Sequence, residues 1–373
     1  MLVKRMAKRH DILWERPRHT QAKHEILTGY LDAWIPIIGS WAEQALLIDG
    51  FAGPGRYAGG EKGSPLLMLD SFLRRRDRDR LKPTFHFVFI EQDRERFQHL
   101  EREIAKRKPN PKVKIHCLHG EFSEHFPPVL ADFKRRFGGL PPTFAFVDPF
   151  GADDSAHRLT SSLIKLPRCE ALIYVPITHL ARFVDHPDLT ATLDNLYGDR
   201  SWEPATQVPS IRERRQILQD AFRVRMRQSC RWVRSFEITP ERGGNAYCLF
   251  FGSNDKQGLR RMKDAMWKID PVEGTRFKDS TTVDHPVLFE HQPDLVRLEE
   301  LLREHFGQSE FSIEQAADYT LTETAFRDNG HLKPVLKEAQ GLDRLEVTRA
   351  KPRRRAGTFP EGTRMRFTAK RAP

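Results

Sequence analysis

A chain of 373 residues with 39% hydrophobic side chains is long enough for two domains, and its 30% charged residues are interspersed with regular apolar segments, which argues against disorder. It holds no run of about 18 apolar residues that would span a bilayer, and the N-terminal MLVKRMAKRH lacks the apolar stretch of a signal peptide, so we expect a cytoplasmic protein that binds no membrane. The formal charge of +11 favours a polyanionic partner, while four cysteines without metal-ligand spacing predict reduced thiols and no metal site.

Apolar runs of strand length alternate with amphipathic stretches of helix length over most of the chain. The seven runs are 45–49, 84–90, 112–118, 143–147, 170–176, 231–239 and 245–253. Helical crossovers between the first five predict a parallel sheet, whereas only PERGG separates the last two, which predicts an antiparallel hairpin. This is the strand inventory of an α/β class I methyltransferase fold, a Rossmann-like, seven-stranded, mostly parallel sheet. We expect that domain to occupy residues 1–284, with an insertion at 177–209 that is either a cap over the substrate or a surface elaboration.

The first predicted strand runs directly into a glycine-rich turn with the sequence DGFAGPG. Glycines let the backbone approach a ligand closely and adopt positive φ, and the GxGxxG fingerprint of dinucleotide binding is absent. In methyltransferases such a turn wraps the methionine half of S-adenosylmethionine, and the acid at its start receives the amino group. A tight turn without a ligand is the alternative. The residues predicted to bind S-adenosylmethionine here are Asp49, Gly50, Phe51, Gly53 and Gly55.

Three further elements are expected to contact the same cofactor. Glu91 ends the second strand, where a carboxylate can accept both ribose hydroxyls. Glu121 and Phe122 follow the third strand, in position for the exocyclic amine and the ring of adenine. The helix ahead of the first strand brings Thr20 and Lys23 within reach of the cofactor from below.

The fourth predicted strand leads into Asp148-Pro149-Phe150-Gly151. This position faces the transferred methyl group. Methyltransferases of adenine or cytosine amines carry Asp/Asn-Pro-Pro and an aromatic residue here; the acid or amide holds the amine and the aromatic stacks on a flipped base. In this chain the aromatic has moved by one place, which keeps the hydrogen-bonding half and leaves the stacking half open. We predict Asp148, Pro149 and Phe150 as catalytic residues; an acid that only caps the next helix is the alternative.

Beyond residue 284 the pattern changes to three short helices followed by the strands LEVTR and RMRFTA. That order, with Ser312 as a helix N-cap, predicts a winged-helix-like domain over 285–373. From residue 349 to the end nine basic residues stand against one acid, a net charge of +8, which favours nucleic acid; a disordered solubilising tail is the alternative. The predicted nucleic-acid-binding residues are Arg353, Arg354, Arg355, Arg364 and Arg366.

Four segments together resemble one known family. HTQAKHEILTGYLDAW, LLIDGFAGPGRY, FVDPFG and NAYCLFFGSNDKQGLRRMKDAMWKIDP are similar to the three-Cys-motif partner proteins of bacteria, and so is the C-terminal VTRAKPRRRAGTFPEGTRMRF. The resemblance implies a methyltransferase-like fold and a partner that carries a three-cysteine motif of the radical iron–sulfur type. This chain lacks that motif, so it corresponds to the partner and not to the cluster carrier. The motifs align residue for residue at Asp49, Gly50, Gly53, Gly55 and Asp148.

Two functions of different classes follow from these observations. The leading hypothesis is an S-adenosylmethionine-dependent methyltransferase that acts on nucleic acid, with DNA ahead of RNA, and works with the iron–sulfur protein. The competing hypothesis is a non-catalytic module that keeps the fold and binds nucleic acid or presents it to that partner. The altered DPFG motif favours the second hypothesis.

Overall fold

A computed structural model describes residues 12–16, 18–108, 110–149, 154–239, 246–278, 293–349 and 355–368. The chain divides into two compact units, residues 1–265 with 276–282 and residues 266–275 with 283–373. The second unit therefore takes in a short stretch ahead of residue 284. Three predicted site residues lie outside the described residues: Phe150, Arg353 and Arg354.

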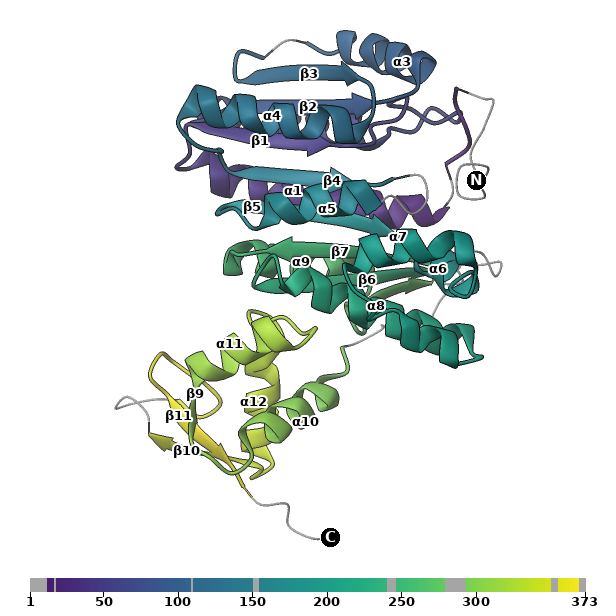
Figure 1. Ribbon diagram of the computed structural model, residues 1–373. Helices are drawn as coiled ribbons and strands as arrows, with labels where there is room; N and C mark the ends of the chain where they lie inside the picture. Colours follow the sequence, from purple (N-terminus) through teal and green to yellow (C-terminus); the bar gives the residue numbers. More distant parts are fainter. Residues whose placement is uncertain are drawn as a thin grey trace. The chain divides into compact units, whose positions relative to one another are not determined.

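The first unit is built on an eight-stranded sheet with the strand order β3-β2-β1-β4-β5-β7-β6-β8 (Figure 1). The strands are β1 (Gln44–Asp49), β2 (Thr84–Glu91), β3 (Val113–His119), β4 (Thr143–Val147), β5 (Cys169–Val175), β6 (Trp232–Thr239), β7 (Tyr247–Ser253) and β8 (Arg276–Lys278). Strands β1 to β5 are parallel, and β7 runs antiparallel between β5 and β6. The prediction of a mostly parallel α/β sheet is confirmed, and each of the seven expected strands lies within two residues of its expected bounds. The three-residue β8, too short for a periodic signal, is an addition that pairs with β6.

Helices cover both faces of this sheet. They are α1 (Arg18–Gly39), α2 (Ser64–Leu73), α3 (Arg94–Ala105), α4 (Phe122–Phe137), α5 (Asp154–Ile164), α6 (Ile177–Arg182), α7 (Pro187–Tyr197), α8 (Ile211–Arg227) and α9 (Lys256–Ile269), with short 3-10 helices at Arg78–Arg80 and Glu203–Gln207. Helices α4 to α8 share one core with sheet residues such as Ala145 and Ile173, so the expected insertion contributes to the core. Helix α1 covers the opposite face, where Tyr30 contacts Phe144 and Phe251.

The order of the strands alone indicates where a ligand would bind to this sheet. From β1 the chain moves to β2 and β3 on one side, then returns to β4 and β5 on the other. In open α/β sheets, ligands bind at the carboxyl ends of the strands where the order reverses in this way. Asp49 is the last residue of β1, and Asp148 directly follows β4. Both predicted acids therefore lie at the reversal point.

The second unit combines three helices with a small antiparallel sheet of order β10-β11-β9. In chain order its elements are α10 (Leu295–Phe306), β9 (Phe311–Ser312), α11 (Ile313–Glu323), α12 (Leu332–Gly341), β10 (Leu345–Arg349) and β11 (Arg364–Phe367). Its core includes Leu298, Leu336 and Met365. Ser312 is the N-cap of α11 as expected: its hydroxyl accepts from the backbone N–H of Gln315 at 3.2 Å, and the Gln315 side chain accepts from the Ser312 N–H at 2.8 Å.

Three general observations complete the fold. Within the described ranges, no helix combines the length and apolar character needed to cross a bilayer. The same residues contain no group of three or more His, Cys, Asp or Glu side chains able to hold a metal ion. The four cysteines are free thiols.

Candidate cofactor and acceptor site

The turn after β1 depends on glycine at several positions. Gly53 and Gly55 adopt φ values of +63° and +81°, which side chains with a Cβ rarely tolerate. Gly50 is required for a different reason, because a Cβ there would lie 2.6 Å from the ring of Phe122. The turn closes when the Gly63 N–H donates to the Gly55 carbonyl at 2.7 Å. Side chains of Phe122 and Leu100 pack closely against Gly50 and Gly55, and the backbone of Gly53, Gly55 and Gly63 forms part of a cavity wall.

Asp49 lies at the start of this turn and is fully buried. Its Oδ1 accepts from the backbone N–H of Phe51 at 3.2 Å, whereas its Oδ2 has no hydrogen-bond partner among the residues that the structure describes. Burial raises the pKa of Asp49 to about 7, against the lowering effects of the Ser64 hydroxyl and the Phe51 amide. A buried carboxylate oxygen without a partner is costly, so the site is suited to a cationic hydrogen-bond donor such as an ammonium group.

Glu91 stabilises the same turn from the end of β2. Its Oε2 accepts from the Gly53 N–H at 2.7 Å and its Oε1 from the Asp93 N–H at 2.8 Å. Burial raises the pKa of Glu91. Each carboxylate oxygen has two lone pairs, so these bonds leave acceptor capacity for a further donor.

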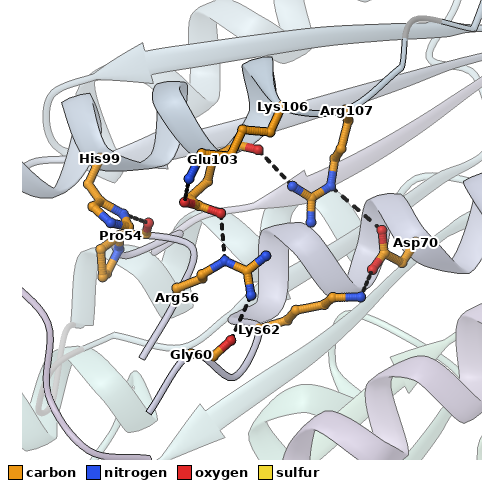
Figure 2. Close-up of polar contacts among 9 residues, drawn as sticks. All are labelled: Pro54, Arg56, Gly60, Lys62, Asp70, His99, Glu103, Lys106 and Arg107. Carbon is orange, nitrogen blue, oxygen red and sulfur yellow. Dashed lines mark hydrogen bonds and ion pairs between the residues drawn. The ribbon is translucent and has the colours of Figure 1, made fainter. Parts of the chain in front are cut away.

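Polar side chains of α3 contact the outer side of the turn, as Figure 2 shows. Glu103 is 3% exposed, and its carboxylate pairs with Arg56 at 2.6 Å and also with Lys106. His99 bonds the carbonyl of Pro54 at 2.6 Å through Nδ1. A buried carboxylate with two cationic partners is well compensated, so these contacts fix the turn in place.

A cavity of about 200 Å³ opens beside the turn. Its wall is formed by the beginning of α1, the glycine turn, the beginning of α2, the residues after β4, and one tyrosine each from β5 and β7. The predicted site residues in this wall are Thr20, Lys23, Phe51, Gly53, Gly55, Asp148 and Pro149. The remaining predicted cofactor residues, Asp49, Gly50, Glu91, Glu121 and Phe122, do not line it. Asp49 lies directly behind the wall, because it interacts with Phe51 and Ser64, which are both part of it.

Lys23 and Asp148 form an ion pair in this cavity. The Lys23 Nζ donates to Asp148 Oδ2, and the two side chains are 10% and 23% exposed. The same Nζ lies 5.7 Å from the ring centre of Tyr174 and 6.0 Å from that of Phe146. The carboxylate expected to hold the acceptor is therefore already charge-compensated, with its other lone pairs still available.

Glu121 and Phe122 lie at the beginning of α4. Glu121 is exposed, and its backbone N–H donates to the carboxylate of Glu124 at 3.4 Å. Phe122 is 4% exposed and stacks between Phe51 and Phe126, with ring centres 5.4 Å and 4.5 Å away. Phe122 is thus connected to the cavity through Phe51.

Several cavity residues were missed in the sequence. His24 is buried, its Nδ1 has no hydrogen-bond partner in the described ranges, and burial lowers its pKa well below 6.5, so the imidazole is neutral near pH 7. Tyr57 lies 5.9 Å from His24 between ring centres, and burial raises its pKa. His24 directly follows the predicted Lys23 and Tyr57 is two residues past the predicted Gly55, which was an available signal. Tyr174 and Tyr247 lie in strands, where a tyrosine cannot be told from an ordinary core residue by sequence, so no signal marked them.

The N-terminal segment 12–16 lies against the turn. The carbonyl of Trp14 accepts from the Ala58 N–H at 2.9 Å, and its ring meets that of Tyr57 edge-on at 5.8 Å. Trp14 also lines the cavity. Residues before α1 therefore complete the wall, a contribution that the sequence did not indicate.

The predicted nucleic-acid-binding residues belong to the second unit. Arg364 and Arg366 alternate with buried residues along β11, so both point outward and are about half exposed. Arg364 pairs with Glu310 at 2.9 Å and Arg366 with Glu346 at 3.1 Å. Arg355, in the segment between β10 and β11, is exposed.

Comparisons with known proteins find similarity in structure alone. No family model and no curated protein sequence matches the chain. Among solved structures it is similar to a protein from Legionella pneumophila (12% identity, 64% of this chain and 85% of that chain, TM-score 0.37). It is also similar to a spermidine synthase in complex with the transition-state analogue AdoDATO (12%, 69% and 69%, TM-score 0.30) and to a candidate O-methyltransferase from Klebsiella pneumoniae (12%, 68% and 94%, TM-score 0.30). At such TM-scores the likeness carries no argument about function, which has to come from this chain's own residues.

Proposed function

We propose that this chain is an S-adenosylmethionine-dependent methyltransferase that acts on nucleic acid, with DNA ahead of RNA. One observation carries the proposal: Asp49, a fully buried carboxylate with one oxygen that no described residue bonds, lies behind a positive-φ glycine turn at the reversal point of a parallel sheet. The strand order with an antiparallel β7 between β5 and β6 supports a class I methyltransferase fold.

The residues present fit the cofactor. Asp49 would accept the ammonium group of its methionine part, and Gly53 and Gly55 would let the backbone lie against it. Glu91 has lone pairs left for ribose hydroxyls, while Glu121 and Phe122 remain proposed contacts for adenine. Bound in this way, the cofactor supplies an electrophilic methyl group.

The acceptor would bind at the opposite part of the cavity wall. Asp148 holds a polar hydrogen of the acceptor with the lone pairs that Lys23 leaves free, and Lys23 in turn fixes the carboxylate in one orientation. Pro149 and Phe150 complete the proposed motif. Because a methyl transfer needs an aligned nucleophile, the contribution of these residues is positioning and the acceptance of a proton at Asp148.

The second unit is proposed to bind the nucleic acid as a winged-helix-like domain. Its order of helix, strand, two helices and two strands supports that reading. Arg355, Arg364 and Arg366, with Arg353 and Arg354, would contact phosphates and contribute salt-dependent affinity with little sequence information. We further propose a three-cysteine iron–sulfur protein as the partner, and a cytoplasmic location for both.

A second candidate function is a non-catalytic nucleic-acid-binding module. The ion pair between Lys23 and Asp148 favours it, because the acceptor carboxylate is already engaged. Turnover separates the two candidates. The full chain is incubated with methyl-labelled S-adenosylmethionine and pooled DNA and RNA, with and without a three-cysteine iron–sulfur protein. Label in nucleic acid is expected; tight binding without label under every condition would favour the module.

Nucleic-acid binding is tested separately by substitution. Deleting residues 349–373 would remove β11, the central strand of the small sheet, so the Arg364→Gln and Arg366→Gln double variant is the sharper choice. We expect the slope of log affinity against log salt to fall by roughly one for each lost phosphate contact, measured with duplex DNA by fluorescence anisotropy. Arg297→Gln, which removes another exposed ion-paired arginine of the same unit, is the control. An unchanged slope in the double variant would argue against this surface.

A further inference from the structure

The altered DPFG motif leaves the acceptor site without a stacking residue at the usual place in the sequence. Two tyrosines from other strands lie in the same cavity wall as Asp148 and Pro149. Tyr174 is the sixth residue of β5, and Tyr247 is the first residue of β7. Because β7 is antiparallel to β5, its beginning lies beside the end of β5, at the same edge of the sheet as Asp148.

The register places both rings on the α1 face of the sheet. Tyr174 lies opposite Leu249, and Tyr247 precedes Leu249 by two residues, so the tyrosines are diagonal neighbours on one face. Their ring centres are 5.0 Å apart with planes inclined at 48°. Lys23, which holds Asp148, lies 5.7 Å from the Tyr174 ring centre. The aromatic pair and the carboxylate therefore border one space.

This combination of groups suits one class of ligand. Aromatic side chains can stack on the face of a planar ligand ring. A carboxylate beside them can accept a hydrogen bond from an amine on the edge of that ring. Flexible aliphatic acceptors would gain little from two rings at the cavity wall. The neutral His24 in the same wall adds no charge that would repel such a ligand.

We propose that Tyr174 and Tyr247 form the stacking platform for a planar nitrogen heterocycle that carries an exocyclic amine, and so supply the stacking contact that the displaced aromatic residue of the DPFG motif leaves open. The inference rests on the proposed function and narrows its substrate to an amino-bearing nucleobase. The two tyrosines are positioning residues: they orient the ring so that its amine meets Asp148. Stacking at the acceptor site would thus come from β5 and β7.

The test uses the full chain, S-adenosylhomocysteine and a single-stranded oligonucleotide with one 2-aminopurine, a base whose fluorescence falls when it stacks on an aromatic ring. Binding to the wild-type chain should quench the fluorescence. Tyr174→Leu and Tyr247→Leu should each weaken binding on the order of tenfold and remove much of the quenching, since base–aromatic stacking is lost. Tyr174→Phe and Tyr247→Phe should behave as wild type, as should Phe183→Leu, which removes an aromatic residue that is 42% exposed outside the cavity.

Each result has a distinct meaning. Leucine variants that bind and quench as wild type would contradict the proposed stacking platform. Phenylalanine variants that lose as much binding affinity as the leucine variants would also contradict it. Thermal stabilisation by S-adenosylhomocysteine is measured on every variant. If the wild type shows none, the proposed function fails, whatever the tyrosines do; if it is present while the tyrosines have no effect, only this inference fails. If the leucine variants do not fold, Tyr174→Trp and Tyr247→Trp are used instead. Because the larger ring should stack on the base, these variants should quench the 2-aminopurine fluorescence at least as strongly as the wild type, and weaker quenching would contradict the platform.

Discussion

Two buried carboxylates lie at opposite ends of the same sheet, Asp49 at the carboxyl end of β1 and Glu170 near the amino end of β5. Their exposures are 0% and 5%, and burial raises the pKa of each to about 7. Glu170 accepts from Tyr30 at 2.5 Å, from Trp34 at 2.9 Å and from Ser253 at 2.6 Å. Within the described part of the chain, Asp49 accepts one backbone N–H and keeps one carboxylate oxygen without a hydrogen-bond partner.

This contrast shows that a raised pKa does not by itself mark a functional acid. What distinguishes the two groups is whether their hydrogen bonds are complete. Glu170 joins α1 to β5 and β7 through three side chains, so its role is structural. Asp49 lies behind a cavity wall and has capacity left for a ligand. Each of the following predictions sharpens or breaks that distinction.

The largest expected effect is on stability, at Glu170. Glu170→Ala leaves the buried hydroxyl of Tyr30 and the indole N–H of Trp34 without an acceptor and takes one acceptor from Ser253, so it should lower the free energy of unfolding by about 3 kcal/mol or more, measured by urea denaturation. The affinity for S-adenosylhomocysteine should stay within about twofold of wild type in calorimetry. Tyr30→Phe, which removes one donor, should cost only about 1 kcal/mol. A large loss of affinity with unchanged stability would reverse the roles assigned to the two acids.

At Asp49 we expect a loss of affinity for the ligand without a loss of stability. Asp49→Asn should weaken S-adenosylhomocysteine binding by roughly 10- to 100-fold, because a hydrogen bond to a charged group contributes about 1.5–3 kcal/mol. Without ligand the variant should be at least as stable as wild type, since a neutral amide replaces a buried charge with an unpartnered oxygen. Calorimetry and thermal unfolding measure the two quantities. Wild-type affinity in this variant would rule out the cofactor assignment.

The raised pKa of Asp49 also predicts how binding depends on pH. The ionised form should bind the ammonium group, so affinity should rise with pH and level off above about 7, with roughly tenfold weaker binding for each pH unit below. Stability without ligand should change in the opposite direction: the folded chain binds protons more tightly, so the contribution of Asp49 falls as pH rises from about 4 to about 7. Asp49→Asn should flatten the affinity profile. If the variant keeps the wild-type profile, another group is titrating.

The smallest expected effect compares two glycines with similar backbone angles. Gly53 has φ +63° in the turn, and Gly138 has φ +69° after α4, where an added Cβ would meet nothing within 4 Å. Alanine should cost about 1 kcal/mol of stability at either position because of the left-handed backbone. Only Gly53→Ala should also weaken S-adenosylhomocysteine binding, by a few-fold. Equal binding in both variants would show that the turn does not contact the ligand.

Local patterns in the sequence were sufficient for the strands of the first unit and for the glycine turn. Alternating or continuous apolar runs predicted seven strands, and the missed β8 has only three residues. Glycines after an acid predicted the turn, because positive φ and close backbone approach are local requirements. Ser312 was recognised for the same reason, since an N-cap satisfies backbone groups only a few residues away.

Contacts between distant residues could not be predicted in this way. Lys23 and Asp148 are 125 residues apart, and Tyr30 reaches Glu170 across 140. Their pairing depends on β4 lying beside β1 and on α1 covering that face, and the tyrosines of β5 and β7 meet only through the antiparallel register. The sequence by itself predicted the strands, the glycine turn and the position of Asp49 and Asp148 at strand ends, because each depends on neighbouring residues. Tertiary structure decided which groups share the cavity, because strand order and register bring together side chains that no local pattern connects.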